Sequence, residues 1–132
     1  MIVIDSSALI AILQNEPERA QFASFIAHAN RKYVSAVTLL EAGMVARSRR
    51  GDAGLAALGE ILADAEIEIV PFDEPLVKLA LQAFARYGKG NPSKARLNLG
   101  DCAAYALAKS VNAPLLYKGT DFANTDIASA SA

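Results

Sequence analysis

The 132-residue sequence has one cysteine, one histidine and no tryptophan, and each scarcity excludes a kind of site. A single cysteine, Cys102, cannot form an internal disulfide, which fits a reducing compartment such as the cytoplasm. Cys102 and His28 together are too few ligands for a closed Cys/His zinc site, which needs four. The sequence also lacks the glycine-rich motifs that bind nucleotide phosphates. Because a Ser-His-Asp centre would depend on His28 alone, the carboxylates are the best candidates for chemistry.

Long hydrophobic runs are missing as well, although 53% of the residues are hydrophobic. Acidic residues interrupt the most apolar stretches, so we expect no membrane-spanning segment. The N-terminal apolar stretch has no basic residue ahead of it and does not resemble a signal peptide. With 20% charged residues, residues 1–132 predict a single globular domain, and we expect residues 127–132 to form a frayed tail.

Short apolar runs alternate with helical periods along the chain. We expect strands at residues 2–4, 33–34, 66–72 and 114–117, and helices at about 7–13, 17–29, 37–47, 52–65, 74–87 and 99–111. This alternation predicts an α/β fold, with a central, mostly parallel sheet and helices on both faces. In such folds, ligands bind at the carboxyl ends of the strands.

Two acidic residues lie where a charge is costly. Asp5 directly follows the first expected strand, and although it could cap the next helix, Ser6 or Ser7 can serve that purpose. Glu41 lies on or at the edge of an apolar helix face. Its alternative role is an ion pair with a following arginine, but no arginine lies three or four residues away. A functional role is therefore favoured for both.

Two further acids are ambiguous when each is considered alone. Asn98 and Asp101 have the spacing of a helix capping box, so Asp101 is equally well explained by structure or by function. Asp121 follows the last expected strand and by itself is best explained as a turn residue.

The stronger indication comes from the set of four acids, because all of them can meet in one cleft. There they can be ionised together only if a cation offsets their repulsion. Ligation by oxygen alone selects Mg²⁺ or Mn²⁺. The set therefore predicts metal-assisted hydrolysis of a phosphate ester.

The distribution of charge indicates a polyanionic substrate. Residues 52–74 hold seven of the 14 acidic residues and no lysine or arginine. Basic residues gather instead just after Glu41 and in the loop at 88–96. Two basic segments beside an acidic pocket can hold a phosphate backbone. The phosphate contacts are expected from Arg47, Lys89, Lys94 and Arg96.

Four segments carry a resemblance to a known family. They are VIDSSALI near the N-terminus, VSAVTLLEA around Glu41, LNLGDCAAYALAK around Asp101 and LLYKGTDF around Asp121. In this order they resemble the PIN domain, and more narrowly the VapC toxin ribonucleases of type II toxin–antitoxin systems. The resemblance covers nearly the whole chain and implies a small three-layer α/β sandwich with an acidic pocket for Mg²⁺ or Mn²⁺.

The same resemblance implies a function and partners. It implies an endoribonuclease that hydrolyses RNA phosphodiesters through a metal-activated water, with tRNA or rRNA as a possible substrate. It also implies a homodimer and a cognate VapB-type antitoxin. Two other functions stay open on the residues alone: a phosphatase of the haloacid dehalogenase type, and a non-catalytic module that binds a metal to regulate a partner. The phosphatase normally has a second acid where Ser7 stands.

The resemblance also assigns roles residue by residue. Asp5, Glu41 and Asp101 match the three core acids, with Asp5 and Asp101 binding the metal directly and Glu41 directly or through water. The fourth acid, also acting directly or through water, is Asp121, with Asp126 as its competitor. The supporting polar positions are matched by Asn98 and by Ser6 or Ser7.

Overall fold

The computed structural model describes residues 1–131, so the last residue of the expected tail, Ala132, lies outside the described residues. Within these residues, four strands and five helices follow one another. They are β1 (Ile2–Ile4), α1 (Ser6–Leu13), α2 (Arg19–His28), β2 (Lys32–Ser35), α3 (Ala36–Asp64), β3 (Glu68–Val70), α4 (Glu74–Tyr87), α5 (Leu99–Val111) and β4 (Leu115–Leu116).

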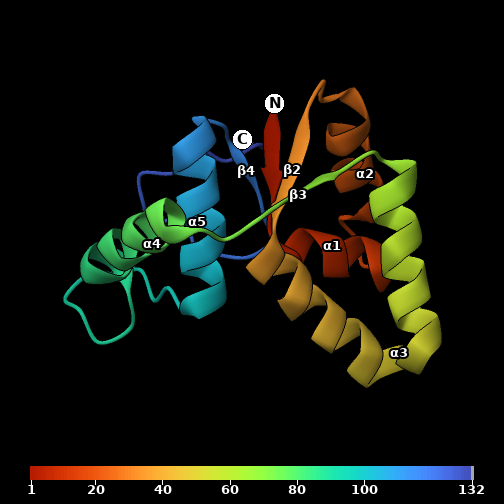
Figure 1. Cartoon of the computed structure of the whole chain (residues 1–132), viewed down its shortest axis with the longest axis horizontal. Coiled ribbons are helices and arrows are strands. Elements are labelled where there is room, and N and C mark those ends of the chain that lie inside the picture. The colour runs from red at the N-terminus through yellow and green to blue at the C-terminus, as the bar shows by residue number, and fades with distance from the viewer. Residues whose placement is uncertain (132) are drawn as a thin grey trace.

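The strands form one parallel sheet in the order β3-β2-β1-β4. β1 is central, and Val3 pairs with Tyr33 on one side and with Leu115 on the other. Helices α4 and α5 cover one face of the sheet, whereas α1, α2 and α3 lie on the other side (Figure 1). The predicted α/β three-layer fold with a parallel sheet is confirmed.

The core is divided between the two faces of the sheet. Ile2 and Ile4 pack into a cluster with residues of α1, α2 and α3, whereas Val3 packs into a second cluster with residues of α4 and α5. Successive side chains of a strand point to opposite faces, which explains this division. Because β1 is buried on both faces, the residue that follows it emerges at the carboxyl edge of the sheet, in the middle of the molecule.

Two expected helices are joined into one kinked helix. Between residues 47 and 52 the chain continues as α3, and the only interruption is at Gly51, with φ 61° and ψ −149°. Figure 1 shows the two arms of α3 set at an angle to each other. β3 is also shorter than the strand expected at 66–72, and Ile69 in it is 48% exposed because β3 is the edge strand of the sheet.

The helix caps confirm most expectations and correct one. Asp5, rather than Ser6 or Ser7, caps α1, since its side chain accepts a hydrogen bond from the Ser7 amide. The expected capping box of Asn98 and Asp101 is present at the start of α5. The prediction that serines relieve Asp5 of this structural role is therefore wrong, because the Asp5 carboxylate reaches the first turn of the helix itself.

The tail is hydrogen-bonded where we expected fraying. The Leu115 amide donates to the carbonyl of Ala128, and the Ala130 amide donates to the carbonyl of Leu115, both at 2.9 Å. These backbone bonds extend the sheet locally beside β4. No helix among residues 1–131 is long and apolar enough to cross a membrane.

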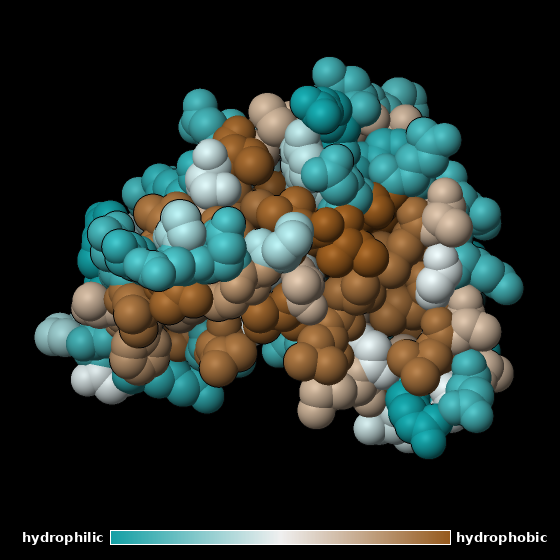
Figure 2. Space-filling view, viewed as in Figure 1, coloured by the Kyte–Doolittle hydropathy of each residue, from teal (hydrophilic) through white to brown (hydrophobic). Residues whose placement is uncertain are grey.

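Apolar side chains also reach the surface. Figure 2 shows them gathered across the middle of the visible face. Leu99 is 78% exposed, and Leu40 and Met44 are each more than 60% exposed. Two apolar grooves lie here, one of about 420 Å³ along α4 and α5 and one of about 480 Å³ between the arms of α3.

Candidate active site

The first acid of the site lies at the carboxyl end of β1. The Asp5 side chain is buried, and its Oδ2 accepts hydrogen bonds from the Ser7 amide at 3.1 Å and from Ser7 Oγ at 2.6 Å. Its Oδ1 is buried without a hydrogen-bond partner. Burial, with a smaller contribution from the Glu41 charge, raises the pKa of Asp5 to about 6, against the lowering effect of the Ser7 hydrogen bonds.

The second acid, Glu41, joins three helices. It lies in the second turn of α3 and is half-buried. Ser6 Oγ at the start of α1 donates to Glu41 Oε1 at 2.6 Å. The Glu41 carboxylate also lies against Gly100 in the first turn of α5. Glu41 is thus half-buried, as a residue at the edge of an apolar helix face, and its hydrogen-bond donor is a serine rather than an arginine.

The third acid, Asp101, has both a structural role and an unusual electrostatic one. Its Oδ2 accepts from the Asn98 amide at 3.1 Å, which completes the capping box of α5. Burial raises the pKa of Asp101 to about 7, although the Asn98 hydrogen bond opposes this. The charges of Asp121, Asp5 and Glu41 contribute to this rise, so the structure brings these three acids close enough to Asp101 to repel it.

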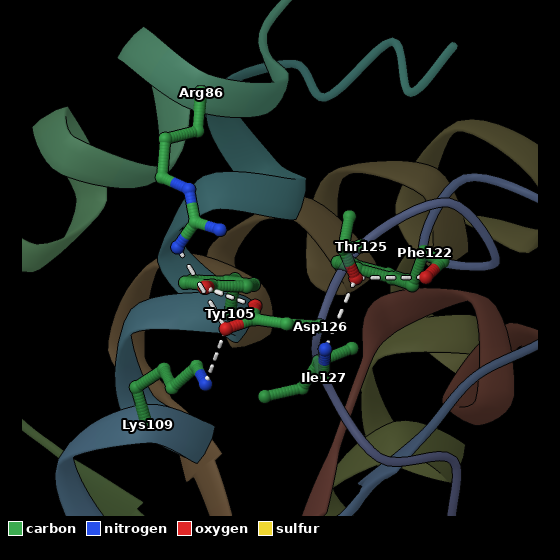
Figure 3. A network of polar contacts seen from close by, with 7 residues as sticks. All are labelled: Arg86, Tyr105, Lys109, Phe122, Thr125, Asp126 and Ile127. Carbon is green, nitrogen blue, oxygen red and sulfur yellow. Dashed lines mark hydrogen bonds and ion pairs between the residues drawn. The ribbon is translucent and has the colours of Figure 1, made fainter. Parts of the chain in front are cut away.

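The two candidates for the fourth acid lie in different surroundings. Asp126 accepts hydrogen bonds from Tyr105 Oη at 2.5 Å and from Lys109 Nζ at 2.8 Å, and its carboxylate lies 3.7 Å from Arg86 (Figure 3). These partners, Lys109 first, lower the pKa of Asp126 to about 2. Asp121 is exposed, and its charge acts on Asp101. The arrangement therefore favours Asp121 as the fourth acid.

The segment that carries Asp121 is attached at both ends. Ahead of it, the Lys118 amide donates to Ser7 Oγ at 2.9 Å, and the same Oγ donates to Asp5. After it, Asp126 is bound to α5 through Tyr105 and Lys109. Ser7 thus couples this segment to the buried acid of β1.

The basic residues near the acids differ from those expected. Arg47 pairs with Asp52 on the surface, and Lys89, Lys94 and Arg96 are exposed in or beside the loop between α4 and α5. Within residues 1–131 the structure records no contact between these four side chains and the acids of the site. Their expected role stays a prediction.

Two other basic side chains stand next to Glu41. Arg49 and Lys118 line a cavity of about 440 Å³ together with Ser6, Ser7 and Glu41. Lys118 Nζ also pairs with two acids of the α1–α2 connection, at 2.6 and 3.2 Å. Arg49 follows Glu41 by eight residues, a little more than two helical turns, and this spacing is the sequence signal that brings Arg49 to the same side of α3.

The site has features that suit a divalent cation. Among residues 1–131, no group of three or more His, Cys, Asp or Glu side chains forms a ready-made metal cage. Mg²⁺, however, is often held by only one or two carboxylates together with water. The unpartnered Oδ1 of Asp5 and the mutual repulsion of the acids are both relieved by a cation, so the residues present fit such an ion.

Comparison with known proteins agrees with the motifs. The family model of the PIN domain matches residues 2–128. The chain is 40% identical over 126 residues to Ribonuclease VapC28 of Mycobacterium tuberculosis, an alignment that covers 96% of this chain and 95% of that protein. This chain belongs to the PIN-domain family, among its VapC ribonucleases. It is also 41% identical over 127 residues to Ribonuclease VapC of Mycolicibacterium smegmatis, with 96% of this chain and 98% of that protein covered.

Solved structures share the PIN fold. The structure of Mycobacterium tuberculosis VapC20, described as a Sarcin-Ricin loop cleaving toxin, has a TM-score of 0.78 at 15% identity, with 96% of each chain covered. A chain of the DNA-bound VapBC complex from Salmonella typhimurium has a TM-score of 0.74 at 20% identity, covering 97% of this chain and 94% of that one. At these identities the likeness shows the fold alone.

Proposed function

We propose that this VapC-family chain is a divalent-metal-dependent endoribonuclease and acts as the toxin of a type II toxin–antitoxin system. The observation that carries the proposal is the buried Oδ1 of Asp5, which has no hydrogen-bond partner at the carboxyl end of β1. The charges of Asp121, Asp5 and Glu41 also act on Asp101, which supports a shared cation. The family assignment supports RNA as the substrate. The same assignment does not support the alternative of a haloacid-dehalogenase-type phosphatase, because the family matched is the PIN domain.

The four acids have different roles in the proposed site. Asp5 and Asp101 bind Mg²⁺ or Mn²⁺ directly, and Glu41 and Asp121 act directly or through water. A divalent ion bound here lowers the pKa of water and stabilises negative charge on a phosphoryl group. Ser7 holds Asp5 Oδ2 and thereby leaves Oδ1 available, while Ser6 holds one oxygen of Glu41. Asn98 holds Asp101 at the start of α5.

Basic side chains supply the contacts with the RNA backbone. Arg49 lines the cavity beside Glu41, where it can neutralise a phosphate next to the cleaved bond, whereas Lys118 in the same cavity is paired with two acids. Arg47, Lys89, Lys94 and Arg96 extend these contacts over the surface. The VapC20 structure is described as that of a toxin that cleaves the Sarcin-Ricin loop. A structured RNA, ribosomal or transfer, is therefore the substrate class that we propose.

The partners follow from the same family. Solved complexes related in fold include VapBC from Salmonella typhimurium and VapBC2 from Rickettsia felis. We infer a VapB-type antitoxin for this chain, and a homodimer that covers part of its exposed apolar surface. The one thiol, Cys102, is free and buried, which suits action in the cytoplasm.

The test is cleavage of labelled total RNA by the purified protein after removal of any bound partner. With Mg²⁺ or Mn²⁺ we expect discrete cuts that leave 5′-phosphate ends, and no cuts in EDTA or with Asp5→Asn. Asp64→Asn, which neutralises an exposed acid at the end of α3, should cut like the wild type. Absence of metal-dependent cutting, with RNA from the source organism included, would instead support a non-catalytic metal-binding module.

A further inference from the structure

The position of Glu41 depends on a residue that has no side chain. Gly100 lies in the first turn of α5, directly before Asp101, and the Glu41 carboxylate occupies the space beside its Cα. A Cβ at position 100 would stand 2.5 Å from Glu41 Oε1 and 2.7 Å from Glu41 Cδ, and it would be closer still to Oε2. These separations are too short for nonbonded atoms, so any larger residue must displace the carboxylate.

The displacement would be local. The atoms in conflict with a Cβ are the far end of a flexible side chain, which can rotate away without moving backbone. Alanine also favours a helix more than glycine does. A methyl group at position 100 therefore changes where a negative charge lies, whereas it has little reason to weaken the fold.

The present position of that charge is favourable for the site. The start of a helix carries partial positive charge from its free amide groups, so a carboxylate against the first turn of α5 is stabilised there. Ser6 Oγ holds the same carboxylate from the α1 side at 2.6 Å. Glu41 is thus held between two helix N-termini, and the α5 side of this arrangement requires glycine.

We infer that Gly100 is a positioning residue, whose missing side chain allows Glu41 to lie against α5 next to Asp101. This inference rests on the proposed function only in so far as Glu41 serves cleavage. The steric part of the inference, that a side chain at residue 100 and the Glu41 carboxylate would occupy the same space, does not depend on the function of the protein.

The first test compares two Gly→Ala variants in helices. For Gly100→Ala we expect cleavage to fall by at least about tenfold and Mn²⁺ affinity to weaken, because small displacements in an active site are costly. Gly59→Ala is the matched control, since a Cβ there has no atom within 4 Å. It should cleave RNA and bind Mn²⁺ like the wild type. Unchanged cleavage and Mn²⁺ affinity in Gly100→Ala would overturn the inference.

The second test shows whether the effect passes through Glu41. Glu41→Asp shortens the side chain and withdraws the carboxylate from position 100. In that background, Gly100→Ala should change cleavage and Mn²⁺ affinity by less than about twofold, whereas independent sites would show the same factor in both backgrounds. An equal factor in both backgrounds would mean that Gly100 acts without Glu41, and the inference would be wrong.

A third measurement separates this inference from the proposed function. In thermal unfolding without metal, Gly100→Ala should raise the melting temperature more in the Glu41→Asp background than in the wild type, because the methyl group then meets no carboxylate. If the wild type binds Mn²⁺ without cleaving RNA, the ribonuclease proposal fails and the affinity comparison still decides on Gly100. If it does neither, the melting temperatures decide. Equal shifts in both backgrounds would overturn the inference.

Discussion

The two oxygens of the Asp5 carboxylate have different tasks. Oδ2 caps α1 through its hydrogen bonds with Ser7, whereas Oδ1 is buried without a partner. A buried charged oxygen with no partner destabilises the fold, and the raised pKa of Asp5, about 6, expresses this cost. At the scale of a residue, the ionised Asp5 side chain therefore destabilises the metal-free fold.

The replacement Asp5→Asn should stabilise the metal-free protein. Asparagine caps a helix as well as aspartate does and carries no charge, so we expect a gain of about 1–3 kcal/mol in the free energy of unfolding at pH 8. Urea denaturation in EDTA measures it. Asp73→Asn is the control, because Asp73 also caps a helix but is exposed, and its effect should stay within about 0.5 kcal/mol. A less stable Asp5→Asn variant would contradict this account.

At the scale of an element, α3 is the helix that builds the site and then turns away from it. Its first arm carries Glu41 and Arg49, and its second arm returns along α1 and α2. The turn between the arms depends on Gly51, whose φ of 61° is unfavourable for residues with a side chain. Gly54 then permits a close approach, since a Cβ there would come within 3.0 Å of the Ala46 backbone.

The replacement Gly51→Ala should destabilise the protein by about 1–3 kcal/mol, because alanine at a positive φ is strained. No neighbour within 4 Å would clash with the new methyl group, so the loss reports backbone strain alone. Gly59→Ala, in the regular second arm, should instead gain about 0.5–1 kcal/mol. Chemical denaturation of both variants gives the comparison. Equal effects of the two changes would show that the kink is not held by Gly51.

At the scale of the whole molecule, acids with opposite pKa shifts lie in two places, the candidate active site and the C-terminal segment. The Asp126 network joins α4, α5 and the C-terminal segment (Figure 3), and it lowers the pKa of Asp126 to about 2. In the site, the pKa of Asp101 is raised to about 7 and that of Asp5 to about 6. The molecule therefore gains stability from one acid as it ionises and loses stability from the other two.

These shifts predict how metal-free stability changes with pH. The Asp126 contribution is present above about pH 4 and is lost as pH falls toward 2. The contributions of Asp5 and Asp101 favour the fold below about pH 4 and are lost as pH rises through 6 and 7. We expect the free energy of unfolding in EDTA to fall between pH 5 and pH 8, on the order of a few kcal/mol.

Two further measurements check that these acids are the cause. Asp101→Asn should flatten the decline between pH 5 and pH 8, because one of the two acids can no longer ionise. Added Mg²⁺ should restore stability at pH 8, since binding to the folded state alone stabilises it. A metal-free protein that is equally stable at pH 5 and pH 8 would contradict the raised pKa values.

The order of the helices and strands, and several of their caps, can be predicted from local sequence. The pattern of apolar residues predicts the elements and their order, and the capping box of Asn98 and Asp101 is visible as a spacing. The parallel sheet follows from the alternation of strands and helices. Asp5 is recognisable because a charge directly follows a buried strand. Helix and strand formation depend on residues a few positions apart, so a sequence pattern contains the necessary information.

Other features depend on segments that meet only after folding. Sequence leaves Asp126 as a competitor of Asp121, and the structure favours Asp121 because Tyr105 and Lys109 on α5 already bind Asp126. Likewise, the sequence predicts two helices, at 37–47 and 52–65, with a charged segment that contains Gly51 between them. In the structure they form one helix, α3, with a kink at Gly51.

The sequence by itself determined the order of the strands and helices and the acids that follow the strands, because those depend on neighbours along the chain. Only the tertiary structure decided that Glu41 lies against Gly100, since residues 41 and 100 come together through the packing of α3 against α5. Whether a glycine provides flexibility, a turn or space for another residue's carboxylate depends on which distant atoms pack beside it, and local sequence carries no record of them.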